Sequence, residues 1–122
     1  MKGKIFLVQW DLVSAKARAG ELRSDGWTVD VESKDGGRAY KLIRQNPPDV
    51  VVIDLSRLPS HGRQTALALR DVKATRKIPI VFVDGKEEDT EKVRAKVPDV
   101  VFTSSTKLKD LLTRFSKPSK VE

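Results

Sequence analysis

The sequence predicts an α/β fold in which the five strands of one parallel sheet alternate with five helices. Residues 50–53 are four branched apolar residues in a row, a pattern typical of a strand buried on both faces of a parallel sheet. Similar short apolar runs alternate along the chain with segments that carry apolar residues at helical spacing. Because crossovers between parallel strands are right-handed, this alternation indicates a doubly wound sheet.

Each expected element has its own signal. The strands are expected within residues 4–9, 27–32, 47–54, 78–83 and 98–102, and the alternation of 27–32 indicates an edge strand. Ser60 is the expected N-cap of the third helix, and an acidic start suits the positive end of the fourth. The inward helix positions are expected to be Leu12, Ala15, Ala19 and Leu22; Ala39, Leu42, Ile43 and Asn46; Thr65, Ala68, Leu69 and Val72; and Leu108, Leu111, Leu112 and Phe115.

The length of 122 residues fits one domain, expected over residues 1–116, followed by a polar tail at 117–122. The absence of cysteine excludes disulfides and thiolate metal sites. No apolar run approaches the roughly 18 residues that span a bilayer, so no membrane association and a cytoplasmic location are expected.

The formal net charge is +7, from 24 basic and 17 acidic residues, which suits an anionic partner. The basic residues are spread along the whole chain, and only 6% of residues are aromatic, which leaves little stacking surface for single-stranded nucleic acid. Direct nucleic-acid binding is therefore not expected, and the charge indicates either an acidic protein partner or a basic surface that is simply solvated.

Asp54 is the first candidate functional residue. It ends the central apolar run, and in open α/β sheets ligands bind beyond the carboxyl ends of the strands. The alternative is that Asp54 only turns the chain, which aspartate does well.

The segment 49–54, followed by Pro59 and Gly62, resembles the receiver domain of bacterial response regulators, the CheY-like family. Residues 78–83 also look like the fourth strand of that family. The resemblance implies a flavodoxin-like sheet with strand order 2-1-3-4-5 and a phosphoryl group passed from a histidine kinase to Asp54. It also implies a divalent cation, Mg²⁺, held by an acidic pair after the first strand, by Asp54 and by the carbonyl of Ser56.

The chain departs from that pattern at the cation site. Gln9 and Trp10 stand where the family has its acidic pair, and neither supplies the missing charge. Asp11 follows and would serve either as a weak metal ligand beside Asp54 or, as we favour, as the N-cap of the first helix. A variant joins Asp11, Asp54 and Asp84 in a three-carboxylate cation site.

Two further positions depart from the family. Asp84 stands where the family has a hydroxyl, and a carboxylate about 4 Å from a phosphorylated Asp54 costs about 4 kcal/mol per charge pair at an effective dielectric near 20. Phe102 or Thr103 stands at the position of the family's lysine, and Lys107 is expected to be an exposed residue that does not reach back. We therefore expect Asp54 and Asp84 to share one crevice with no cationic side chain beside them.

Two functions remain open, and no catalytic activity is expected. One is a stand-alone receiver-like protein of a phosphorelay, in which a histidine kinase phosphorylates Asp54. The other is a pseudo-receiver that binds an acidic signalling partner, or a second copy of itself, without phosphorylation. Its expected partner face comprises the fourth helix, fifth strand and fifth helix, with the basic residues Lys92, Lys96, Lys107 and Lys109.

Overall fold

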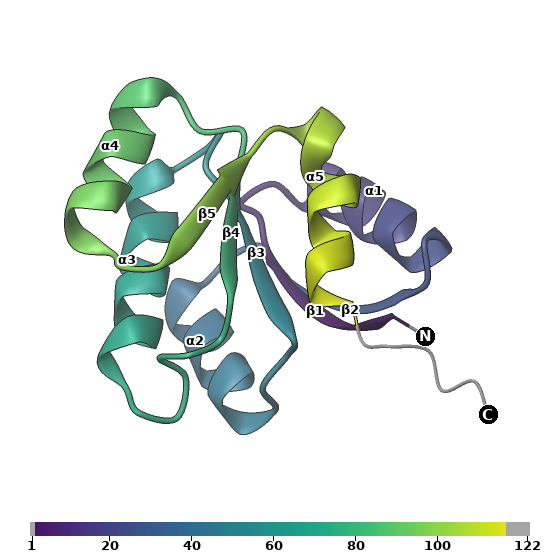
Figure 1. The fold of residues 1–122 in the computed structure, drawn as a ribbon, viewed down its shortest axis with the longest axis horizontal. Helices are drawn as coiled ribbons and strands as arrows, with labels where there is room; N and C mark the ends of the chain where they lie inside the picture. The colour runs from purple at the N-terminus through teal and green to yellow at the C-terminus, as the bar shows by residue number, and fades with distance from the viewer. Residues whose placement is uncertain (1, 117–122) are drawn as a thin grey trace.

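The structure is a computed structural model and describes residues 2–116; the predicted polar tail, 117–122, lies outside the described residues. It contains β1 (Gly3–Val8), β2 (Trp27–Glu32), β3 (Val50–Asp54), β4 (Ile80–Val83) and β5 (Val100–Thr103). All neighbouring strands are parallel, and their order is β2-β1-β3-β4-β5 (Figure 1). The predicted doubly wound sheet and its strand order are therefore confirmed.

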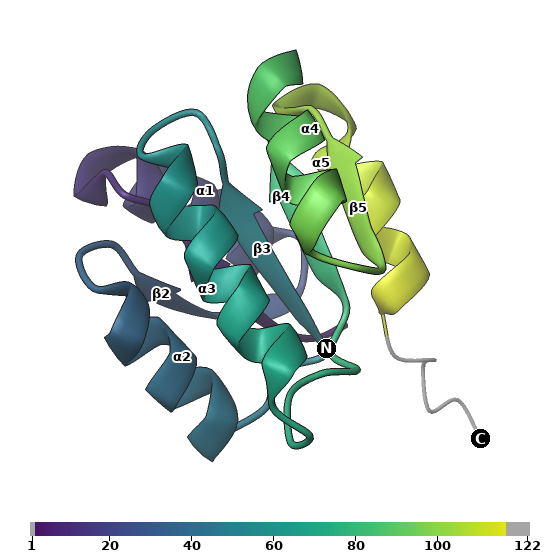
Figure 2. The same cartoon turned by 90° about the vertical axis from the view of Figure 1, so that its left-hand side faces the viewer.

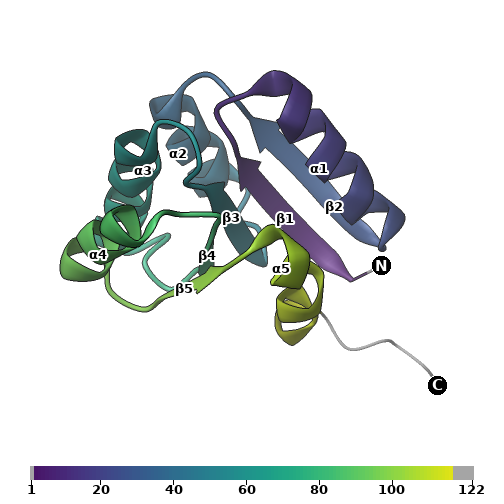
Figure 3. The same cartoon turned by 90° about the horizontal axis from the view of Figure 1, so that it is seen from above.

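Five helices alternate with the strands and cover both faces of the sheet (Figure 1). Figure 2 shows α2, α3 and α4 on one face, and Figure 3 shows α1 and α5 on the other. A short 3₁₀ turn, Thr113–Phe115, follows the last helix. The helices are α1 (Leu12–Ser24), α2 (Gly36–Gln45), α3 (Pro59–Asp71), α4 (Glu87–Lys96) and α5 (Ser105–Leu112).

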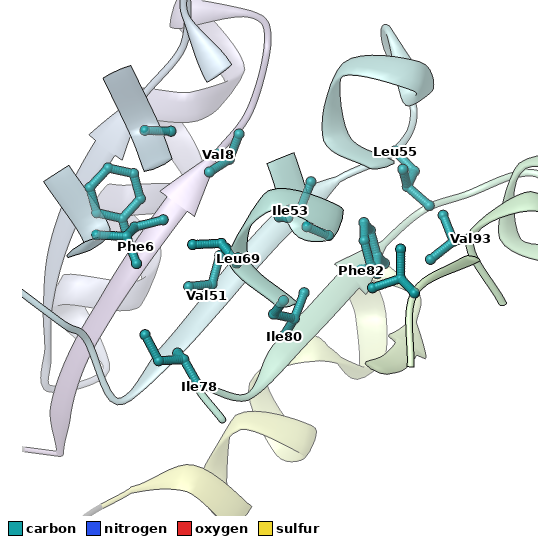
Figure 4. Close-up of a cluster of buried hydrophobic side chains, with 14 of the residues drawn as sticks. Phe6, Val8, Val51, Ile53, Leu55, Leu69, Ile78, Ile80, Phe82 and Val93 are labelled. Carbon is teal, nitrogen blue, oxygen red and sulfur yellow. The ribbon is translucent and has the colours of Figure 1, made fainter. Parts of the chain in front are cut away.

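The sheet separates two hydrophobic clusters, and β3 contributes to both. Every residue of β3 is buried, as the apolar run at 50–53 predicts. Val51 and Ile53 point into the cluster beneath α2, α3 and α4 (Figure 4), whereas Val50 and Val52 pack beneath α1 and α5. This double burial holds the end of β3, and therefore Asp54, in a fixed position.

The predicted helix faces agree with the structure at most positions. Ala15, Ala19 and Leu22 of α1 are buried, but Leu12, the first residue of the helix, is 45% exposed. Among the inward positions predicted for the other helices, Asn46 is exposed and follows the end of α2. No helix among residues 2–116 is long and apolar enough to cross a membrane.

The predicted N-cap of the third helix is wrong. The helix begins at Pro59, with Leu58 as its N-cap in the left-handed region (φ 45°), so Ser60 lies inside the first turn. The reason is that proline has no N–H to lose and a φ already suited to the first helical position. Gly62 lies in the first turns of this helix at a close-packing position, because a Cβ there would lie 2.8 Å from a methyl carbon of Ile53.

Candidate functional site

The candidate site lies at the carboxyl ends of β1, β3 and β4, where the sheet reverses its winding direction. Gln9 follows β1, Asp54 is the last residue of β3, and Asp84 follows β4 with a left-handed backbone (φ 57°). Adjacent parallel strands end at the same edge, so these three polar side chains share one crevice.

Asp54 is buried, with only 4% of its surface exposed, and both of its carboxylate oxygens accept hydrogen bonds. Oδ1 accepts from the backbone N–H of Ser56 at 2.7 Å and from the Ser56 hydroxyl. Oδ2 accepts from Nη1 of Arg18 at 2.9 Å, which makes an ion pair. Ser56 therefore contributes its N–H and hydroxyl to Asp54 in this structure.

Arg18, on α1, is the cation at the centre of the crevice, and its side chain is only 14% exposed. Besides Asp54, its Nη1 donates to Oε1 of Gln9 at 3.2 Å. Its Nη2 lies 3.4 Å from Oδ2 of Asp84 and donates to the Ser105 hydroxyl at 2.6 Å. The planar guanidinium thus connects groups at the carboxyl ends of β1, β3, β4 and β5, which a single ammonium could not do.

This geometry corrects one prediction and supports another. Asp54 and Asp84 both reach the same guanidinium, so they face one crevice, as expected. The expectation that no cationic side chain lies beside them is wrong, because the cation comes from the first helix. Arg18 lies three residues after Ala15 and four before Leu22, on the buried side of α1. A charged residue on that apolar face was the sequence signal for it.

Asp84 is held as a carboxylate by its neighbours. Its Oδ1 accepts from the backbone N–H of Ser105 at 2.8 Å, and its Oδ2 accepts from the Ser105 hydroxyl. Burial raises the pKa of Asp84, but these hydrogen bonds and the Arg18 guanidinium outweigh burial and hold that pKa below its usual value. Ser105 was missed from the sequence because it is 21 residues away from Asp84 along the chain.

Asp11 is the N-cap of α1, which is the role favoured for it from the sequence. Its side chain accepts from the backbone N–H of Ser14 at 3.2 Å, and Arg57 lies 3.7 Å away. The hydrogen bonds from Ser14 lower the pKa of Asp11, and Arg57 adds to the effect. Ser14 also accepts from Nε2 of Gln9 at 2.9 Å, so Gln9 joins the N-terminus of α1 to the crevice.

Neither Trp10 nor Thr103 is among the described hydrogen-bond or ion-pair partners of Asp54, which are Arg18 and Ser56. Trp10 packs into the hydrophobic cluster beneath α2 and α3, with its ring edge-on to His61 at 5.6 Å between centroids. Its buried Nε1 has no hydrogen-bond partner among the described residues. Thr103 pairs in register with Val83, and its carbonyl accepts from the N–H of Asp84. Thr103 therefore orients Asp84 through the backbone, whereas Trp10 is a packing residue.

The side chains present do not fit a divalent cation. Mg²⁺ needs carboxylate or carbonyl oxygens around an open position. Here the space between Asp54 and Asp84 holds the Arg18 guanidinium, and Gln9 directs its amide oxygen to the same group. Among residues 2–116, no three acidic or histidine side chains gather in a metal-binding arrangement, so the three-carboxylate cluster of Asp11, Asp54 and Asp84 is not formed.

The chain is similar to several known proteins, although no protein-family model matches it. Protein PilH of Pseudomonas aeruginosa is 33% identical over 66 residues, which cover 54% of this chain and 54% of PilH. The match thus spans about half the length of that relative.

Solved structures extend the likeness over almost the whole chain. Chemotaxis protein CheY4 of Vibrio cholerae matches with a TM-score of 0.78 at 16% identity, covering 94% of this chain and 99% of that one. The receiver domain of a sensor histidine kinase from Pseudomonas aeruginosa, solved with a magnesium ion in its active-site cleft, matches with a TM-score of 0.79 at 22% identity, covering 94% and 98%. The chain therefore has the flavodoxin-like fold of CheY and the response-regulator receiver domains.

Proposed function

We propose that this chain is a receiver-like module of two-component or chemosensory signalling that binds its partners without phosphorylation of Asp54. The receiver fold and the partial likeness to PilH support the signalling role. Of the two functions that the sequence left open, the geometry of the crevice favours the pseudo-receiver over the phosphorylated receiver. The module is a protein-binding one, without a reaction of its own.

One observation carries the proposal: the ion pair between Arg18 and Asp54. Phosphorylation requires one oxygen of Asp54 to attack phosphorus, and both oxygens already accept hydrogen bonds in a buried site. Phosphoryl transfer also builds charge on three equatorial oxygens, which divalent cations neutralise in related phosphotransfer reactions. Arg18 supplies a single, fixed positive charge that Asp54 and Asp84 already share.

In this proposal the guanidinium has a structural role in place of the cation. It joins α1 to residues at the carboxyl ends of β1, β3 and β4 and to the start of α5, so the crevice is held in one arrangement without a ligand. Such a module presents its surfaces constitutively to a partner, for example a histidine kinase, another signalling protein or a second copy of the chain. The face formed by α4, β5 and α5 is one such surface, and its four predicted lysines, Lys92, Lys96, Lys107 and Lys109, are all exposed.

The test is incubation with acetyl phosphate and MgCl₂ followed by intact-mass spectrometry. We expect no phosphoryl adduct on the wild-type chain, while a receiver domain with a complete acidic pair, treated in parallel, is modified. An adduct on the wild type that the Asp54→Asn variant lacks would restore Asp54 as a phosphoacceptor and overturn the proposal.

A further inference from the structure

A second surface, which shares no residue with the Asp54 crevice, carries an excess of positive charge. It is a groove of about 370 Å³ lined by α1, the end of β2 and the turn that leads into α2, and α1 lies along β2 in Figure 3. Its rim carries the basic residues Lys16, Arg23, Lys34 and Arg38. We call these four residues and the space between them the basic groove.

The basic groove contains one carboxylate, and the chain itself satisfies it. Glu32, at the end of β2, is buried, and its Oε2 accepts from the backbone N–H groups of Lys34 and Asp35 at 3.0 and 3.1 Å. Its Oε1 lies 3.3 Å from Nε of Arg38. The negative charge of Glu32 therefore stabilises the turn before α2 and leaves the other three cations uncompensated.

Those three cations have few partners of their own. Nη2 of Arg23 donates to the backbone carbonyl of Val29, a neutral group, at 2.7 Å. The ammonium groups of Lys16 and Lys34 form no ion pair with any residue in 2–116. Since exposed like charges repel one another, this arrangement favours an anionic partner.

Apolar side chains also line the basic groove. Leu12, which the sequence pattern placed in the core, lines the groove and is 45% exposed, and the partly buried Val31 lines it too. Apolar lining residues among cationic ones suit a protein segment that alternates acidic and apolar side chains. Nucleic acid fits less well, because no aromatic side chain lines the groove for base stacking.

The face formed by α4, β5 and α5 is less suited to an acidic partner. Arg94 pairs with Glu91 at 2.8 Å, and Lys109 lies 3.5 Å from Asp25. The first turn of α4 adds three further acidic residues to that face: Glu87, Glu88 and Asp89. Its positive charge is therefore partly neutralised, whereas that of the basic groove is not.

We propose that the basic groove binds an acidic protein segment whose apolar side chains contact Leu12 and Val31. This surface is additional to the face of α4, β5 and α5, and the proposal does not depend on the state of Asp54. A partner held in the groove contacts α1 and the edge of the sheet at β2, so the opposite edge of the sheet remains open to a second protein.

The experiment uses the full chain and a fluorescent peptide of alternating glutamate and leucine. We expect the peptide to bind, with binding that weakens as salt is added, and to shift the backbone amide signals of α1, β2 and the start of α2 in nuclear magnetic resonance spectra. The double variant Lys16→Glu, Lys34→Glu should weaken binding about tenfold, since each exposed charge reversal removes an attraction and adds a repulsion. The Leu12→Ser variant should also weaken it, because the apolar contact is lost.

The matched control is the double variant Lys73→Glu, Lys77→Glu, which changes the net charge equally at exposed positions between α3 and β4. It should bind like the wild type. No peptide binding at low salt, equal losses in the two double variants, or signal shifts confined to α4, β5 and α5 would each overturn the proposal. Tighter binding of a single-stranded DNA probe, lost in the Lys16→Glu, Lys34→Glu variant, would assign the groove to nucleic acid and also overturn it. None of these outcomes affects the acetyl phosphate test of Asp54.

Discussion

Helix α1 supplies cations to two regions that differ in their degree of charge compensation. On its buried side, Arg18 enters the crevice, where it meets Asp54, Asp84, Gln9 and Ser105. On its exposed side, the helix lines the basic groove, where charges have few internal partners. The crevice is closed by the chain's own contacts, and the groove is open to a partner.

The difference follows from burial. A charge removed from water must be paired and hydrogen-bonded, because an unpaired buried charge costs several kcal/mol. Exposed lysines are solvated without a partner, at little cost to the free energy of folding. Unpaired charges at the surface therefore indicate a site that binds a partner. Charges that are buried and fully paired indicate a site that stabilises the fold.

The largest predicted effect is that of Arg18→Met. Methionine retains part of the apolar stem but leaves the buried Asp54 carboxylate without its cation, so the free energy of unfolding should fall by about 3 kcal/mol. Urea denaturation at neutral pH measures it. Arg18→Lys should give an intermediate loss, because one ammonium cannot reach all of the groups that the guanidinium contacts. A loss below about 1 kcal/mol for Arg18→Met would show that the ion pair is not a major support of the fold.

The next largest effect concerns Asp54→Asn, whose effect on the free energy of unfolding should have opposite signs with and without Arg18. In the wild type, Asp54→Asn should lower the free energy of unfolding by about 1 kcal/mol, because a charge-assisted hydrogen bond is replaced by a weaker one. In the Arg18→Met background the same substitution should raise it, because it removes an uncompensated buried charge. A double-mutant cycle measures this coupling. Additive effects would contradict direct pairing of the two residues.

Asp84 should produce a smaller, pH-dependent effect. Its pKa in the folded state lies below the ordinary value of 3.8, so its contribution to stability is complete above that value and is lost as the pH falls through the lower folded pKa. The stability advantage of the wild type over Asp84→Asn should therefore shrink between about pH 5 and about pH 2. Because the Asp84 side chain is 35% exposed, solvent screening keeps this effect below that of Arg18. An advantage that is independent of pH would refute the assignment.

The smallest effect should come from the basic groove. Lys16→Gln with Lys34→Gln should change the free energy of unfolding by no more than about 0.5 kcal/mol, with a slight gain from reduced repulsion between like charges. Thermal denaturation at low and high salt measures it, and added salt should abolish the gain. A loss of unfolding free energy comparable to that of Arg18→Met would mean that the lysines of the basic groove are paired within the chain, as Arg18 is in the crevice.

Patterns along the chain predict the fold because the spacing of buried residues follows the regular geometry of the backbone in strands and helices. The apolar run at 50–53 correctly predicts a central strand, and the end of that run predicts Asp54 at the crevice. Asp11 also behaves as its position before a helix indicates. The expected elements therefore differ from the observed ones mainly at their ends, where proline and left-handed residues such as Leu58 decide the boundary.

The contents of the crevice could be predicted only in part. The positions of Gln9, Asp54 and Asp84 depend on strand ends, which the sequence indicates. Arg18 reaches them with a long side chain from the middle of a helix, and the end of such a side chain lies far from its backbone position. The only local sequence signal for this role was that Arg18 lies on the same helix face as Ala15 and Leu22. A search for periodic apolar residues does not detect a charged residue at such a position.

In the proposed function, Arg18 takes the position that a divalent cation would need. Isothermal titration calorimetry of MgCl₂, and then MnCl₂, into the wild-type chain is the decisive test of this replacement. We predict no heat of binding beyond dilution for either metal. A saturable heat that the Asp54→Asn substitution abolishes would contradict the claim, because it would mean that the cation displaces the guanidinium from Asp54.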